Sequence, residues 1–400
     1  MTTSENSVTV QGEGTKAQPC VLFLLDWKPV LWSTREEYFL LLSKSLREQG
    51  IVPILTVSEQ QEPEAIRRLE QGGAVVRQVG YGHDKLGYWR YIRAIAARHD
   101  VLIAQVRFFD YFALIHWQCR LSGIRNIIFT EANSGEWNRS GWRAMAARLR
   151  TWVVCAPLKR VIAISGFIRR RLEATGISSD IIRTVYNGID VNVYTPEAGL
   201  REELDQQFRC ERGSLLICFA SALLGWKRPS LALEACQRLR ALGVPFTLLM
   251  AGNGPLRKEL EEEARALGID DSVRWLGHYP HLQRLLGGSD VFLHTAVGEA
   301  FGNVLAEAMA AGLPVVATRS GGTPEVVDDS CGVLVDPGEG EAERLGAALA
   351  RLAREEGLKR RLGDAGVRRA NELFSLETAV RNTLEVYREL TGGRITVPPR

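Results

Sequence analysis

Short apolar runs alternate with helical patterns along almost the whole chain, and this alternation occurs in two blocks. In the first block the apolar runs predict strands at 21–25, 51–57, 74–77, 101–105, 126–130, 161–164 and 181–185. In the second block they predict strands at 214–221, 246–251, 273–276, 291–294 and 314–318. After 318 we expect only helices, the last of them at 376–390. Repeated strand–helix units of this kind predict parallel sheets whose strands are buried under helices on both faces.

The alternation is interrupted once, where Asn187-Gly188-Ile189-Asp190 is followed by Pro196 and Gly199. A chain of 400 residues is also too long for one ordinary hydrophobic core. We therefore predict an α/β protein with two doubly wound, Rossmann-like domains that face each other across a cleft. The predicted divisions are a flexible tail at 1–18, a first domain at 19–190, a linker at 191–213, a second domain at 214–375 and a terminal helix and tail at 376–400.

Composition and charge narrow the class of protein. Residues 1–195 carry 25 Lys and Arg against 18 Asp and Glu, so the first half is the better candidate to face an anionic partner, but this excess is too small for a nucleic-acid binder. The seven scattered cysteines never form Cys-x-x-Cys, so we expect reduced core thiols. Neither a secretory leader nor an apolar run of membrane-spanning length is evident, and we expect a soluble, cytoplasmic protein.

The segment 298–318 carries the strongest functional signal. It places a loop with two glycines, Gly298 and Gly302, between a predicted strand and an alanine-rich helix. The first turn of such a helix has unpaired backbone N–H groups and the positive end of the helix dipole, which together favour a phosphate group. Gly302 additionally permits a close approach of the backbone to a ligand.

Two carboxylates flank this helix start. Glu299 lies in the loop, and Glu307 lies about five residues inside the helix, roughly 7–8 Å along its axis. Because ionised carboxylates accept hydrogen bonds from hydroxyl groups, this spacing suits a ligand with a sugar on one side of a diphosphate and a ribose on the other. The simpler interpretation is a helix-forming Glu307 and a solvated Glu299. The coincidence with the glycine loop and the buried strand favours binding.

With these features, the chain resembles the retaining glycosyltransferases of the GT-B fold, specifically family 4. The resemblance covers nearly the whole chain and is strongest in the second half. Besides 298–318, the matching segments are 164–167, 186–190, 226–227, 251–256, 275–278 and 321–327. The resemblance implies a hexosyltransferase of carbohydrate biosynthesis, with a last helix that crosses back to the first domain and couples closure of the cleft.

For the sugar side of the donor, the resemblance implies that Glu299 binds hydroxyl groups of the transferred sugar. The backbone amides of Phe301, Gly302 and Asn303 assist it. Lys227 is implied to neutralise the diphosphate. The family usually supplies a second cation, an arginine, five residues before this lysine, but the matching residue here is Ala222. We therefore expect Lys227 to act as the main side-chain cation.

For the nucleotide side, the resemblance implies that the amides near Val304 and Leu305 bind the distal phosphate and that Glu307 binds the ribose. The loop Gly277-His278 is implied to contact the base through backbone groups. Uridine is favoured because it is the commonest base in the family, and guanosine remains an alternative. No residue in the sequence identifies the sugar or the acceptor, which we describe only as a small molecule, a glycan or a lipid-linked group.

The first domain departs from the family pattern. Ser33-Thr34 stands where many members have a glycine pair, and either residue is equally well explained as the cap of the next helix. No histidine follows the strands at 101–105 and 126–130. Gln105, Glu131 and Asn133 occupy the matching places and are candidates for contact with the sugar or the acceptor.

The favoured mechanism requires neither a metal nor a cofactor, because amides and cations stabilise the departing diphosphate and the chain contains no Asp-x-Asp sequence. Two alternatives stay open, namely another nucleotide-sugar enzyme of this architecture, such as an epimerase or synthase, and a two-lobed binding protein. The basic stretch 139–171 contains interleaved aromatic residues. We favour packing of its apolar face on the first sheet, and weak, peripheral membrane association is the alternative.

Overall fold

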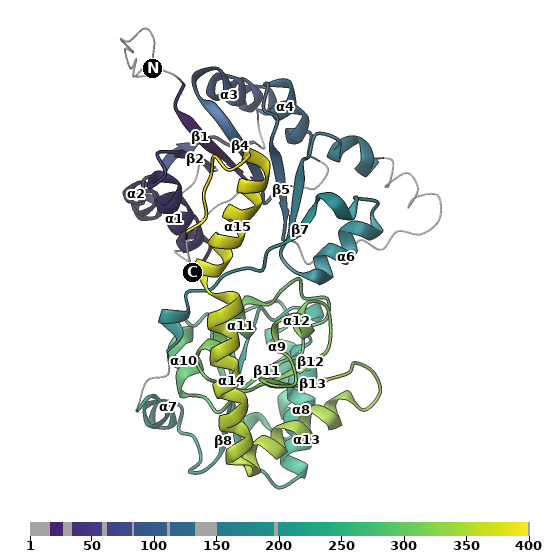
Figure 1. The fold of residues 1–400 in the computed structure, drawn as a ribbon. Coiled ribbons are helices and arrows are strands. Elements are labelled where there is room, and N and C mark those ends of the chain that lie inside the picture. Colours follow the sequence, from purple (N-terminus) through teal and green to yellow (C-terminus); the bar gives the residue numbers. More distant parts are fainter. Residues whose placement is uncertain are drawn as a thin grey trace, which may run out of the picture.

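The structure is a computed structural model that describes residues 17–26, 34–57, 62–81, 84–109, 113–132, 150–195 and 199–398. These residues form two β-sheets, which belong to two domains placed one above the other in Figure 1. All pairings between neighbouring strands are parallel. The predicted α/β class with two Rossmann-like domains is therefore confirmed.

The first sheet has seven strands in the order β3-β2-β1-β4-β5-β6-β7. The strands are β1 Pro19–Leu25, β2 Val52–Val57, β3 Val75–Gln78, β4 Asp100–Arg107, β5 Ile127–Glu131, β6 Arg160–Ala163 and β7 Ile182–Thr184. Among the described residues, the helices around them are α1 Thr34–Arg47, α2 Pro63–Gln71, α3 Lys85–Arg98, α4 Ile115–Leu121 and α6 Gly166–Ala174. The side chains of β2 are all buried, as a continuous apolar run between two helical layers requires.

The second sheet has six strands in the order β10-β9-β8-β11-β12-β13. They are β8 Leu215–Ala220, β9 Phe246–Ala251, β10 Val273–Gly277, β11 Val291–His294, β12 Val315–Thr318 and β13 Gly332–Val335. The helices of this domain are α7 Leu200–Phe208, α8 Pro229–Ala241, α9 Arg257–Ala266, α10 Leu282–Gly288, α11 Asn303–Ala310, α12 Thr323–Val326 and α13 Glu341–Arg354. The prediction that only helices follow residue 318 was wrong, because β13 is a four-residue edge strand, too short to show a periodicity.

In both sheets the order in which successive strands are added reverses near the centre, and this reversal determines where a ligand can bind. β1 lies between β2 and β4 in the first sheet, and β8 lies between β9 and β11 in the second. Loops that leave neighbouring strands at such a point turn to opposite faces, which opens a crevice at the carboxyl ends of the strands. Residues at the ends of β4 and β8 line the same cavity, so the two crevices face each other across the cleft.

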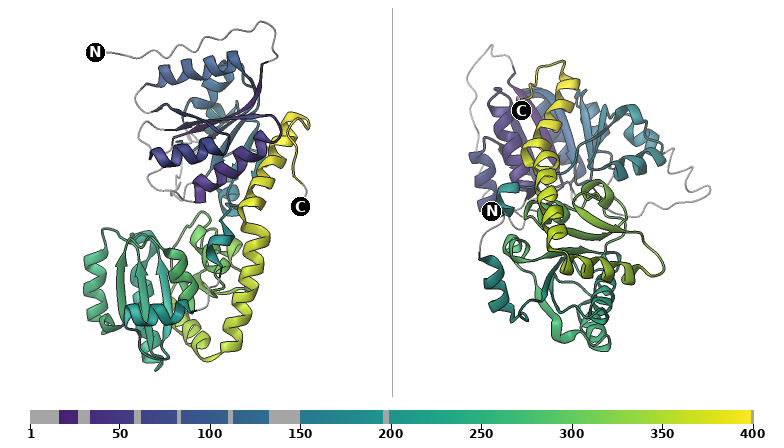
Figure 2. Two further views of the ribbon diagram at one scale, coloured as in Figure 1. Left: turned by 90° about the vertical axis from the view of Figure 1, so that its left-hand side faces the viewer. Right: turned by 60° about the horizontal axis from the view of Figure 1, so that its bottom comes forward.

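The end of the chain returns from the second domain to the first. Helix α14 (Glu356–Phe374) packs against α11, and helix α15 (Leu376–Thr391) packs against α1. The two helices run along one side of both domains in Figure 2. At the crossing, the Ile189 N–H donates to the carbonyl of Phe374 at 2.7 Å, and the Leu376 N–H donates to the carbonyl of Ile189 at 3.0 Å. The linker and the returning helix are therefore joined backbone to backbone.

A second contact between the domains involves the carboxylate of Glu325 on α12. It accepts hydrogen bonds from the backbone N–H groups of Gly166 and Phe167, both at 2.5 Å, in the first turn of α6. A negative charge is stabilised at a helix N-terminus by the dipole and the unpaired amides. Beside it, the Ser165 hydroxyl donates to the carbonyl of Ala300 at 2.5 Å. These bonds tie α6 of the first domain to the loop that precedes α11.

Two further sequence expectations concern the thiols and membrane segments. All seven cysteines are free, and six of them are buried, which confirms the expected reduced core thiols. Among the described residues, no helix is both long enough and apolar enough to cross a bilayer.

We expect the α15 packing to contribute strongly to stability. Leu384 of α15 is fully buried in a cluster with residues of β1 and α1. Leu384→Ala should lower the free energy of unfolding by about 2–5 kcal/mol, because it removes apolar burial and leaves a cavity. Urea denaturation provides the measurement. Arg388→Ala on the exposed side of the same helix is the control and should change the value by less than about 0.5 kcal/mol. Equal effects of the two substitutions would contradict this packing role.

Candidate active site

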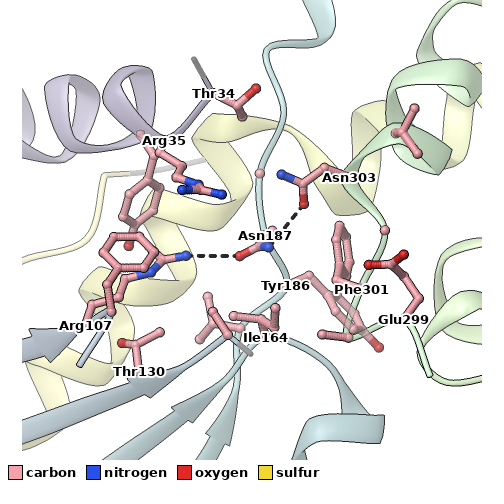
Figure 3. A pocket seen from close by; sticks show the side chains of 18 of the residues that line it. Thr34, Arg35, Arg107, Thr130, Ile164, Tyr186, Asn187, Glu299, Phe301 and Asn303 are labelled. Carbon is pink, nitrogen blue, oxygen red and sulfur yellow. Dashed lines mark hydrogen bonds between the residues drawn. The ribbon is translucent and has the colours of Figure 1, made fainter. Parts of the chain in front are cut away.

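A cavity of about 580 Å³ lies between the two domains. First-domain residues, including Arg35 and Arg107, form one wall, and Lys227, Glu299 and Asn303 belong to the second-domain wall. Figure 3 shows Asn187, from the segment that follows β7, between these two walls. The cavity is therefore assembled from segments that are far apart in the sequence.

The loop before α11 lies against the cavity because glycines permit its course. Gly302 has φ 89° and precedes the first residue of α11. A Cβ atom on Gly321 would lie 2.4 Å from the carbonyl oxygen of Glu299, and one on Gly322 would lie 2.5 Å from that of Ala300. Because Gly321 and Gly322 have no side chains, their backbone can pack directly against the backbone of the loop. This close packing holds the start of α11 at the cavity wall.

The start of α11 and the residues just before it form part of the cavity wall. Phe301, Gly302, Asn303 and Val304 all line the cavity. The Leu305 N–H instead donates to the carbonyl of Gly302 at 2.9 Å. The Leu305 side chain is fully buried and does not line the cavity. Of the two amides expected to bind a distal phosphate, Val304 is thus at the wall and Leu305 is already hydrogen-bonded within the protein.

Lys227 and Glu299 form an ion pair in the second-domain wall, and their side chains are only 14% and 10% exposed. The Lys227 Nζ atom also lies 4.1 Å from the centroid of the Trp226 ring. The lysine backbone is held by the Thr295 hydroxyl, which donates to the Lys227 carbonyl at 2.9 Å. These contacts restrict the ammonium group to a position beside the start of α11.

Two neighbours of this pair do not add positive charge to the wall. The His294 Nε2 atom lies 3.8 Å from a Glu299 oxygen, but burial, together with the charge of Lys227, lowers the pKa of His294 to about 3. This histidine is therefore neutral at pH 7. Arg228 adopts a left-handed backbone with φ 52°, and its guanidinium pairs with Glu341 at 2.8 Å. It is not among the residues that line the cavity.

Glu307 lies on α11 but is not among the residues that line the cavity. It is 9% exposed and accepts a hydrogen bond from Tyr194 in the linker segment Val191–Tyr194. Burial raises the pKa of Glu307 to about 7, and the hydrogen bond from Tyr194 opposes this rise. The carboxyl is thus close to half-protonated at neutral pH, and Tyr194 is a partner that the sequence analysis did not consider.

The predicted base-contact loop lies at the edge of the second sheet. Gly277 ends β10 with φ 65°, and its carbonyl accepts a hydrogen bond from the Gly252 N–H at 2.7 Å. The His278 side chain is exposed. Neither residue lines the central cavity. Their contact with a base therefore remains a prediction.

The candidate site residues of the first domain differ in whether they line the cavity. Thr34 begins α1 and lines the cavity, whereas Ser33 and Asn133 lie outside the described residues. Gln105 lines the cavity, but its amide donates to the Thr130 hydroxyl at 2.8 Å and its oxygen accepts from Tyr387 of α15. Its polar atoms therefore connect the sheet to the returning helix.

Glu131 does not line the cavity, so its assignment to the cleft needs correction. It is 3% exposed and lines a separate small hollow with Arg171, while the preceding Thr130 faces the cavity. Successive side chains of a strand point to opposite faces, and a one-residue difference along β5 decides which of them reaches the ligand. The sequence placed Glu131 correctly at the end of the strand but did not indicate which face its side chain occupies.

The basic stretch 139–171 is described only from residue 150 onward. Val154, Cys155 and Leu158 belong to the first-domain core, in agreement with the expected packing of its apolar side. Trp152, one of the aromatic residues interleaved in this stretch, is however 70% exposed. Residues 139–149, with the other interleaved tryptophan, lie outside the described residues.

The sequence analysis missed Arg35 and Arg107, which line the first-domain wall. The Arg107 guanidinium donates to the Asn187 side-chain oxygen at 3.3 Å, and the Asn187 amide donates to the Asn303 oxygen at 3.1 Å (Figure 3). A signal was present, because Arg107 ends β4 and Arg35 is in the first turn of α1, both at the carboxyl edge of the sheet. The sequence analysis considered histidines at this edge but not arginines.

No group of three or more His, Cys, Asp or Glu side chains within the described part of the chain is arranged to hold a metal ion. The described polar groups that line the cavity are amides, hydroxyls, cations and the carboxylate of Glu299.

Comparisons with known proteins cover both domains. Residues 201–369 match the family model described as Glycosyl transferases group 1, and residues 36–193 match the model described as Glycosyltransferase Family 4. Together these two matches extend over most of both domains.

Two curated relatives each match this chain over about half of their own length. A D-inositol 3-phosphate glycosyltransferase of Xylanimonas cellulosilytica is 35% identical over 231 residues, which are 55% of this chain and 54% of the relative. An MMP alpha-(1->4)-mannosyltransferase of Mycolicibacterium hassiacum is 33% identical over 218 residues, 53% of this chain and 49% of the relative. The chain thus spans about half the length of the curated relatives it matches.

Solved structures support the fold over a longer span. The structure of Anabaena HepE in complex with UDP and glucose has a TM-score of 0.74 and 20% identity, and the match covers 93% of this chain and 100% of that one. At this identity the likeness shows the GT-B fold, with its two Rossmann-like domains.

The raised pKa of Glu307 predicts a pH-dependent contribution to stability. The folded protein holds this proton more tightly than the unfolded chain does, because the pKa is about 7 instead of its ordinary 4.5. The contribution of Glu307 is therefore most favourable below pH 4.5 and is lost as the pH rises through 7. Wild-type protein should lose stability relative to Glu307→Gln over this interval, by at most about 1.4 kcal/mol per pH unit.

Urea denaturation of both proteins between pH 5 and pH 8 provides the measurement. Glu343→Gln, at an exposed position of α13, is the matched control and should follow the wild-type protein at every pH. A difference between wild type and Glu307→Gln that stays constant from pH 5 to pH 8 would show that burial does not raise this pKa.

Proposed function

We propose that the chain, whose two domains match the models described as Glycosyltransferase Family 4 and Glycosyl transferases group 1, transfers a sugar from a nucleoside diphosphate sugar to an acceptor hydroxyl. The observation that carries this proposal is the start of α11, where the residues from Phe301 to Val304 line the interdomain cavity. Lys227 and Glu299 lie beside them. A diphosphate, a cation and a carboxylate for sugar hydroxyls can meet at this place.

The diphosphate is bound, in this proposal, by the N-terminus of α11. The unpaired amides of the first turn and the helix dipole act together on an anion. Lys227 supplies the neighbouring positive charge. Because these donors are held in place by backbone packing, they do not need to reorganise as charge develops on the leaving group.

Donor binding would rearrange the Lys227–Glu299 pair. In the unliganded cavity each of the two charges compensates the other. A diphosphate offers the lysine a second anionic partner, and the carboxylate of Glu299 then accepts hydrogen bonds from hydroxyl groups of the sugar. Glu307 serves the nucleotide side in this proposal, where it shares the ribose hydroxyls with Tyr194.

The reaction proposed for this site is transfer with retention at the anomeric carbon. The bond from that carbon to the diphosphate oxygen breaks, and the acceptor oxygen forms the new bond on the same face. The proton of the acceptor hydroxyl passes to the departing phosphate oxygen. The protein contributes orientation and electrostatic stabilisation, and neither a side-chain nucleophile, a metal nor a cofactor takes part.

A uridine diphosphate sugar is the favoured donor, and a guanosine diphosphate sugar is the alternative. The bound UDP and glucose of Anabaena HepE support the first choice. A small-molecule acceptor is supported by the name of the D-inositol 3-phosphate glycosyltransferase from Xylanimonas cellulosilytica.

The direct test measures release of the nucleotide. The protein is incubated with UDP- and GDP-sugars, with and without excess EDTA, and the released UDP or GDP is quantified. We expect release from at least one sugar, unchanged by EDTA, because amides and Lys227 stabilise the diphosphate. Tight nucleotide binding with no release from any sugar, even with acceptors added, would indicate a binding protein. Loss of release in EDTA that magnesium or manganese restores would overturn the metal-independent mechanism.

Replacement of Lys227 tests the role of the cation. Charge on the diphosphate grows as the sugar bond breaks, so the lysine should stabilise the transition state more than the bound donor. Lys227→Ala should therefore lower kcat by ~10²–10³ with a smaller change in the KM for the donor. Steady-state nucleotide release gives both constants. Lys258→Ala, on helix α9, is the control and should retain wild-type values. Near-normal turnover of Lys227→Ala would remove Lys227 from the diphosphate site.

A further inference from the structure

Arg107 is a partly buried cation for which the described residues supply no counter-ion. Burial lowers its pKa, and no carboxylate of the described residues forms an ion pair with it. Its guanidinium makes one side-chain hydrogen bond, to Asn187, and its shielded Nε atom has no partner in the described part of the chain. A buried charge is costly unless it is paired, so this arrangement points to an anion that arrives with a ligand.

The guanidinium of Arg107 is positioned by aromatic rings. Its central carbon lies 5.6 Å from the ring centroid of Tyr38 and 5.0 Å from that of Phe108. Phe108 has φ 68°, a left-handed conformation that is unfavourable for a bulky residue. Such strain is characteristic of functional sites, where the surrounding structure enforces it.

A second arginine shares this platform. The guanidinium carbon of Arg35 lies 5.5 Å from the Phe108 centroid, and Arg35 lines the cavity together with Arg107. Arg35 is close enough to Arg107 to help lower its pKa. Two mutually repelling guanidinium groups at one cavity wall are stabilised by an oxyanion between them, which can accept paired hydrogen bonds from each fork.

Both walls of the cavity contain cationic side chains. In the second-domain wall, Lys227 is neutralised by Glu299. The first-domain wall contains Arg35 and Arg107. Asn187 stands between Arg107 and Asn303 at the start of α11, and it is hydrogen-bonded to both (Figure 3). The arginines are therefore separated by a side chain from the amides proposed to bind the donor diphosphate.

We propose that Arg35 and Arg107 form a subsite for an oxyanion of the acceptor, so that the acceptor carries a phosphate or carboxylate group. The inference rests on the proposed glycosyl transfer, because it assigns the substrate that enters opposite the donor. The anion binds to the first-domain wall, and the acceptor hydroxyl is thereby directed toward the sugar at Glu299. An uncharged analogue of the acceptor would lack this interaction with Arg35 and Arg107.

The experiment uses nucleotide-saturated protein, so that the amides of α11 are already occupied. Whichever of UDP and GDP binds more tightly is added to saturation, and inorganic phosphate or L-malate is then titrated by calorimetry. Phosphate represents a phosphorylated acceptor, and L-malate represents a carboxylate. We expect at least one of them to bind the wild-type complex. Arg107→Met and Arg35→Met should each weaken that binding about tenfold or more, with unchanged nucleotide affinity.

Three comparisons make the result specific. Arg35→Met, at an exposed position, covers the case in which Arg107→Met fails to fold. Arg107→Lys retains the charge without the fork and should bind the anion at an intermediate affinity. Arg125→Met removes one exposed positive charge from the same domain and should behave as the wild type.

Several outcomes would overturn the subsite. These are wild-type protein that binds neither anion, equal anion binding by wild type and both methionine variants, and variants that lose nucleotide affinity instead, which would assign the arginines to the donor. Failure of the proposed function is distinguishable from all three, because wild-type protein would then release no nucleotide from any sugar.

Discussion

The site depends on how the two domains are held against each other at the hinge. The carboxylate of Glu325 binds the first turn of α6, and Ser165 of the same turn binds the carbonyl of Ala300. Nearby, the rings of Tyr186, Phe301 and Phe374 form a cluster with centroid separations of 5.4–5.9 Å. The linker, the loop before α11 and the returning helix therefore share one packed contact. Any movement of the cleft must be accommodated around it.

This arrangement explains why the cavity combines groups of unlike origin. The second-domain wall is built from one continuous stretch around Glu299 and from Lys227 on a neighbouring loop. The first-domain wall is built from the ends of separate strands and helices, among them Arg35 and Arg107. The second wall contains the Lys227–Glu299 pair, whereas the first contains two guanidinium groups, of which Arg107 has no counter-ion among the described residues. The two proposals follow from this difference, since a diphosphate suits the amides of α11 and a further oxyanion suits the arginines.

Sequence patterns predicted the strand order of neither sheet, but they located nearly all the strands. Continuous apolar runs are a strong signal when a strand is buried on both faces, as β2 is. The half-buried edge strand β13 gave no such signal. Within the site, the segment around α11 was identifiable because the glycine loop, the helix start and both glutamates are contiguous. Its local physics could be followed without tertiary information.

The sequence by itself determined two parallel α/β domains and a glycine loop that leads into the N-terminus of α11, because these features depend on local periodicity and backbone freedom. Only the tertiary structure decided which side chains face the cavity. It paired Lys227 with Glu299, turned Glu131 away while Thr130 faces the cleft, and joined Arg107 to Asn303 through Asn187. Side-chain direction, burial and the choice of counter-ion depend on neighbours that are distant in the chain, which no local pattern records.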